Sequence, residues 1–69
     1  MNFINIAFVQ FAHENKWTAK QVVRELANEG LNKDESVKVL SELIPEAHSG
    51  LNDECVKLLC NAVKEIVKG

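Results

Sequence analysis

The first twelve residues carry no charge, and they constrain the fold more than any other part of the chain. This segment, MNFINIAFVQFA, holds all three phenylalanines and places apolar residues on nearly every side of a helix. A surface helix keeps a polar face toward water, whereas a helix that is apolar all round must be buried on more than one side. Because so short a chain offers little protein to bury it, the segment predicts contact with a partner chain.

The length of the chain sharpens this expectation. Its 69 residues allow one domain, residues 1–69. A domain of this size buries only about 60% of the surface of its unfolded chain, so its stability is marginal without reinforcement. The usual reinforcements are disulfides, a structural metal or oligomerisation.

Neither disulfides nor a metal fits the sequence. Cys55 and Cys60 stand five apart in a helical pattern, which directs them about 140° apart and separates them by about 7.5 Å along the axis. A disulfide needs Cβ atoms within about 4.5 Å. The same cysteines, with His13 and His48, lack the paired spacing of structural zinc sites, so we expect no metal and no cofactor. Two free thiols and no secretory signal indicate a cytoplasmic protein.

Hydrophobic periodicity and capping residues predict four helices and no strand. The expected helices cover residues 2–15, 18–30, 32–44 and 52–68. The third is expected to end at Ile44, because Pro45 disfavours helical geometry in the residue before it, and residues 46–50 are expected to form a turn. The predicted fold is all-α: a compact bundle of four short helices in a single domain, with antiparallel neighbours because the connections are short.

The first helix has two apolar sides. At 100° per residue, the stripe on one side predicts an ordinary core face, which consists of Phe3, Ile4, Ala7, Phe8 and Phe11. Ile6, Val9 and Ala12 lie on the other side and form a surplus. The fourth helix also has an apolar arc of about 200°, wider than a single-sided helix needs. This surplus predicts a homodimer or higher oligomer through the first helix and, in one version, also the fourth.

Trp17 stands in the connection between the first two expected helices. Such a tryptophan usually covers the core, but tryptophan is also enriched at binding hot spots. The candidate partner-binding residues are therefore Ile6, Phe8, Val9, Ala12, His13 and Trp17.

Several other kinds of function lack their usual residues. Cys55 would gain some reactivity near a helix N-terminus, but Asp53 and Glu54 oppose this and no histidine stands at an interpretable spacing. The glycines form no phosphate-binding loop. The first helix is too short to span a bilayer, and it has no lysine or arginine before Lys16 to hold it at a membrane surface. We therefore expect neither an enzyme nor a membrane protein.

Exclusion leaves a small, non-enzymatic protein-interaction module, which is a regulator, inhibitor, adaptor or antitoxin-like partner acting through the first helix. The alternative is a helix-turn-helix DNA-binding regulator, with the first helix as dimer interface and the third as recognition helix. Asp34 and Glu35 open that third helix, only Lys33 and Lys38 are basic in it, and the net charge is −2. This charge distribution argues against nucleic acid as the partner.

Overall fold

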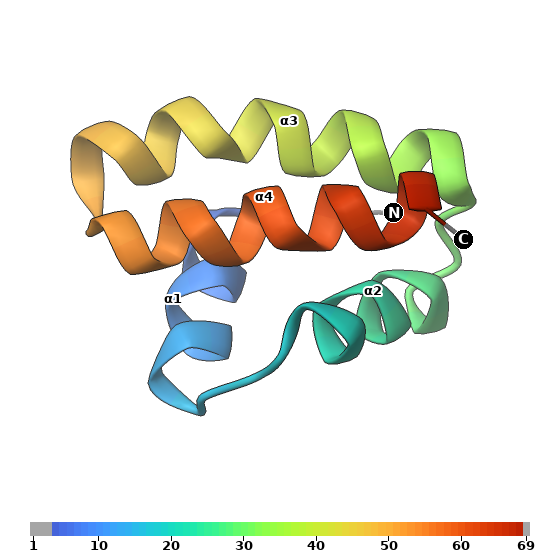
Figure 1. Cartoon of the computed structure of the whole chain (residues 1–69), viewed down its shortest axis with the longest axis horizontal. Coiled ribbons are helices and arrows are strands. Elements are labelled where there is room, and N and C mark those ends of the chain that lie inside the picture. The colour runs from blue at the N-terminus through green and yellow to red at the C-terminus, as the bar shows by residue number, and fades with distance from the viewer. Residues whose placement is uncertain (1–3, 69) are drawn as a thin grey trace.

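The protein folds into a bundle of four α-helices joined by short connections (Figure 1). The structure is a computed structural model, and it describes residues 4–68. Its helices are α1 (Ile6–Glu14), α2 (Ala19–Asn28), α3 (Lys33–Gly50) and α4 (Asp53–Lys68), and the described residues contain no strand. The predicted all-α class is confirmed.

Helix α4 is the centre of the bundle. It packs antiparallel to α3 as a helical hairpin, and α1 and α2 lie on its other side (Figure 1). Helix α1 runs steeply across α4 rather than alongside it. The prediction of antiparallel neighbours therefore describes the α3–α4 hairpin but not α1.

Each helix contributes one row of side chains to a single core. The buried apolar residues are Val9, Ala12, Val22, Leu26, Leu40, Leu43, Ala47, Cys55, Leu59, Ala62 and Ile66. Rows of this kind, with three- and four-residue spacing, place one stripe of each helix against its neighbours.

Side-chain caps begin all four described helices. The hydroxyl of Thr18 accepts from the Gln21 N–H at 3.2 Å, and the amide oxygen of Asn52 accepts from the Cys55 N–H at 3.0 Å. Asn32 forms a full capping box with Glu35, in which each side chain accepts from the other's backbone N–H. These three caps confirm the helix starts expected from sequence.

The start of α1 differs from the prediction. Its cap is Asn5, whose side-chain oxygen accepts from the Ala7 N–H at 2.9 Å. The cap expected at Asn2 lies outside the described residues, as does Phe3. An asparagine at either position can accept a hydrogen bond from a backbone N–H in the first turn of a helix. The local sequence therefore does not distinguish Asn2 from Asn5 as the cap.

The predicted end of α3 at Ile44 is wrong, because the helix continues through Pro45 to Gly50. Residues 46–50 are helical rather than a turn. The extension buries Ala47 completely in the core. The hydroxyl of Ser49 also donates to the Pro45 carbonyl at 2.9 Å. Tertiary packing has overridden the local preference of proline, which lies exposed on the outer face.

The orientation of α1 is the main correction. Val9 and Ala12, expected on a partner-facing side, are buried in the core at 1% and 0% exposure. Phe11 and Ala7, expected in the core, are exposed. The apolar surplus on the first helix is therefore part of this chain's own core face, whereas Ala7 and Phe11 of the other stripe face outward.

Candidate protein-binding surface

The turn after α1 explains where the aromatic side chains go. Lys16 has φ 57°, in the left-handed region that glycine usually occupies at a helix end. Its N–H donates to the His13 carbonyl at 3.0 Å, and the Trp17 N–H donates to the Ala12 carbonyl at 2.9 Å. This pair of hydrogen bonds is a Schellman motif, which reverses the chain and brings Trp17 back over the last turns of α1.

Trp17 meets two phenylalanines edge to face. Its ring centroid lies 5.8 Å from that of Phe8 and 5.4 Å from that of Phe11, with interplanar angles of 74° and 87°. Such T-shaped pairs add about 0.5–1.5 kcal/mol beyond the area that they bury. We call Phe8, Phe11 and Trp17 the aromatic cluster. Trp17 therefore gives Phe11 an aromatic contact outside the core, while Phe8 contacts both Trp17 and the core.

The cluster is partly open to solvent. Phe8 and Trp17 are half-buried and pack against the core, whereas Phe11 is 53% exposed. An aromatic ring held in one geometry and still exposed can bury further area on a partner at little entropic cost. Aromatic side chains, phenylalanine and tryptophan included, are enriched in the cores of protein interfaces.

An open groove of about 680 Å³ lies beside the cluster, between the end of α1 and the first half of α4. The residues that line it are His13, Glu14, Lys16, Trp17, Glu54, Lys57, Leu58 and Asn61. Trp17 and Leu58 are half-buried and supply apolar surface, and charged side chains surround them. The groove is therefore amphipathic.

His13 joins α1 to the start of α4 at one end of the groove. Its Nε2 lies 3.5 Å from the amide nitrogen of Asn52 and 3.6 Å from a carboxylate oxygen of Glu54. When Nε2 carries no proton it can accept from Asn52, and when it carries one it faces the carboxylate of Glu54. Either contact links the end of α1 to the start of α4.

The six sequence-predicted partner residues separate into two groups. Phe8, His13 and Trp17 come together at the cluster and the groove. Ile6 is half-buried against the core, and the interior positions of Val9 and Ala12 remove them from any surface. Sequence reasoning missed Phe11, Lys57 and Leu58. The wide apolar arc on the fourth helix was a signal for Leu58, whereas nothing local indicated that Phe11 faces outward.

The start of α3, which a helix-turn-helix reading would place in a major groove, is acidic. Asp34 and Glu35 occupy its first turn. The carboxylate of Glu35 accepts from the Asn32 N–H at 3.0 Å, so it is held at this end of the helix. Negative charge fixed at that end opposes approach to phosphate groups.

The described residues include two cysteines and several carboxylates outside the groove. Cys55 is buried and Cys60 is half-buried, both as free thiols. Over residues 4–68, no three His, Cys, Asp or Glu side chains gather closely enough to bind a metal ion. Within the same range, no helix combines the length and apolarity needed to cross a membrane.

Comparison of the chain with protein-family models, curated proteins and solved structures finds no match in any of the three. The aromatic cluster and the groove beside it are therefore the observations on which a function can rest.

Proposed function

We propose that this protein is a small, non-enzymatic interaction module that binds a partner protein through the aromatic cluster and the adjoining groove. The observation that carries the proposal is the 53% exposure of Phe11. The centroid of its ring lies 5.4 Å from that of Trp17. Interface cores are enriched in aromatic residues, and rigid aromatic anchors lose little side-chain entropy on binding. A regulator, inhibitor, adaptor or antitoxin-like protein would act by occupying its partner's surface in this way.

The proposed surface keeps three of the residues expected from sequence, Phe8, His13 and Trp17, and lacks Val9 and Ala12. Val9 and Ala12 are used by the core, so the apolar surplus that predicted a homodimer is largely satisfied within one chain. Self-association stays a prediction, now one that would use Phe11 and Trp17. The mixture of apolar and charged groups around the groove supports a different protein as partner, because obligate homodimer interfaces are more apolar.

Site-specific photo-crosslinking tests this proposal. A benzoylphenylalanine is placed at Phe11 and, as the control, at Lys38, which is exposed on α3 away from the groove. In cells that make this protein, we expect a discrete crosslinked species from position 11 and none of the same mass from position 38.

Mass spectrometry of the crosslinked species identifies the partner and separates a second copy of this chain from a different protein. The absence of a crosslink at position 11, or equal crosslinking at positions 11 and 38, would contradict the proposed function.

A further inference from the structure

The charges along the groove identify the kind of partner. We propose that the groove binds an amphipathic helical segment whose polar face carries carboxylates. This inference rests on the proposed function and adds to it the chemistry of the partner.

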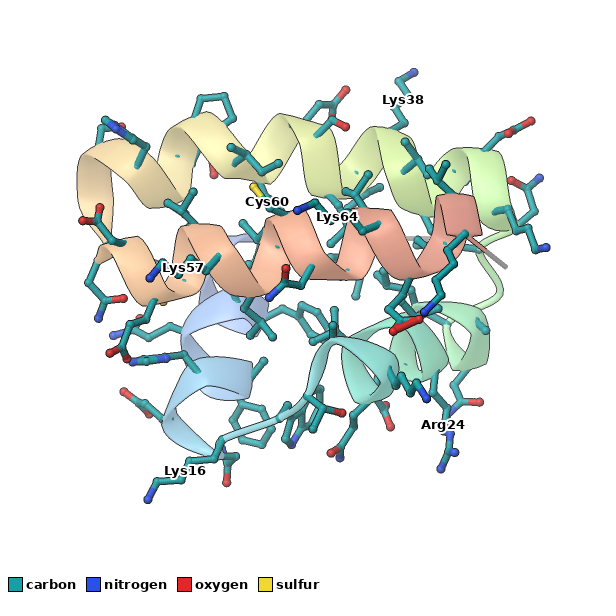
Figure 2. All side chains as sticks on the ribbon, viewed as in Figure 1. Lys16, Arg24, Lys38, Lys57, Cys60 and Lys64 are labelled. Atoms are coloured by element: carbon teal, nitrogen blue, oxygen red, sulfur yellow. The ribbon has the colours of Figure 1, made fainter. Side chains whose placement is uncertain are left out.

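The basic side chains follow one line along α4. Lys57 and Lys64 are seven residues apart, so they stand on the same side of the helix, about 10.5 Å apart along its axis. Both are exposed, and Figure 2 shows them spaced along α4, whereas Lys38 projects from α3 away from it. A partner helix with carboxylates two turns apart has the matching repeat.

A second hollow adjoins the groove along α4. Asn61 borders both the groove beside Trp17 and this second hollow, which Ala19, Lys64, Glu65 and Lys68 also line. From Lys57 to Lys68 the lining covers about 16.5 Å of helix, or three turns. This length fits a short helix lying along α4 better than it fits a small molecule.

The balance of charge on this face differs from that of the whole chain. The two hollows are lined by four of the eight basic residues, Lys16, Lys57, Lys64 and Lys68. They are lined by only three of the ten acidic residues, Glu14, Glu54 and Glu65, and Glu54 lies beside His13. The rest of the chain is therefore net acidic. An acidic partner is attracted to this face and repelled by the others.

The apolar side chains along the groove would contact the apolar face of the partner helix. Trp17 and Leu58 are half-buried in the first hollow, and Ala19 is half-buried in the second. A helix that presents apolar residues at three- and four-residue spacing can rest on these groups, while its carboxylates reach the lysines. Phe11, at the edge of the cluster, extends the apolar contact.

The test uses a synthetic amphipathic peptide helix with leucine on one face and glutamate on the other. A sister peptide carries lysine in place of glutamate. Trp17 is the only tryptophan in the chain, so its fluorescence reports occupation of the groove directly. We expect the glutamate peptide to change this fluorescence, to shift the amide resonances of Lys57, Leu58 and Asn61, and to bind more weakly as salt rises.

Substitutions of the lysines test whether binding of the glutamate peptide depends on the charges along α4. We expect at least tenfold weaker binding of the glutamate peptide to the double variant Lys57→Glu, Lys64→Glu, and a smaller loss for Lys57→Gln, Lys64→Gln. The matched control Lys38→Glu, on α3, should bind as the natural chain does. All three positions changed are exposed, and a natural circular dichroism spectrum checks that each variant is folded.

Three results would overturn the inference. They are equal or tighter binding of the lysine peptide at the groove amides, no binding of the glutamate peptide, and loss of binding in the Lys38→Glu control. If any of these occurs while position 11 still crosslinks to a partner, the chemistry assigned to the partner is wrong and the proposed function stands. A failed crosslink contradicts the proposed function separately.

Discussion

Helix α1 and the α3–α4 hairpin use their large side chains in opposite ways. In the hairpin, Leu40 and Leu59 are fully buried. In α1, the fully buried positions hold the smaller Val9 and Ala12, whereas Phe8 is half-buried and Phe11 is exposed. The hairpin therefore buries its large apolar side chains in the core, whereas α1 leaves part of its apolar surface exposed to solvent.

The lengths of the helices and the turn after α1 account for this difference. Helices α3 and α4 have 18 and 16 residues and pack antiparallel, so their stripes meet over several turns. Helix α1 has 9 residues and runs across α4, which limits close contact to a short stretch. The Schellman turn then supplies Trp17 as a surface partner for Phe8 and Phe11. An apolar face of a helix therefore need not be the face that packs in the core.

Shortening a buried side chain in the hairpin should lower the free energy of unfolding strongly. We expect Leu40→Ala to lower the free energy of unfolding by about 3 kcal/mol, because Leu40 is fully buried and the substitution leaves a cavity. The control Val67→Ala, in the same hairpin at an exposed position, should change it by less than about 0.5 kcal/mol. Urea denaturation followed by circular dichroism measures both, and equal losses would mean that the hairpin is not the packed core.

The continuation of α3 through proline gives the second largest effect. Pro45→Ala should raise the free energy of unfolding by about 2 kcal/mol, since it restores a backbone N–H and a favourable residue in the helix interior. Part of the gain is offset because proline also restricts the unfolded chain. Glu46→Ala, at the next exposed position of α3, serves as control and should be nearly neutral. A loss of stability in Pro45→Ala would indicate that the helix ends before residue 45.

These two regions also show what the sequence could predict. The starts of α2, α3 and α4 were correct because each depends on a side chain and a backbone N–H only three residues apart, as Asn52 and Cys55 illustrate. The end of α3 was wrong because it depends on Ala47 packing in the core, which no local pattern records.

The candidate site also contains residues that the sequence predicts and residues that it does not. Trp17 and His13 were predicted from residue type and place in the chain, and the structure brings both to the groove. Phe11 was assigned to the core, since helical periodicity identifies two apolar sides of α1 but cannot say which one faces α4. The groove itself depends on the crossing of α1 over α4, a tertiary property with no signature in either helix.

The turn after α1 gives the smallest effect, with an unusual sign. Lys16→Gly should raise the free energy of unfolding by about 0.5 kcal/mol, because glycine adopts positive φ without the steric cost that lysine has there. The same substitution at Lys38, inside α3, should lower it by about 1 kcal/mol. Opposite signs for the two lysines would support the Schellman turn that holds Trp17. A loss at both positions would contradict it.

The most direct test of the account places the same residue on each side of α1. Glutamate is introduced in Val9→Glu and in Phe11→Glu, and urea denaturation followed by circular dichroism gives the free energy of unfolding of each variant. We predict a loss of about 4 kcal/mol for Val9→Glu, because a charge enters the packed core without a partner. We predict a loss of only about 1 kcal/mol for Phe11→Glu, which removes one exposed aromatic contact. A loss for Phe11→Glu that equals or exceeds the loss for Val9→Glu would show that the aromatic side of α1 faces the core, and it would contradict the account.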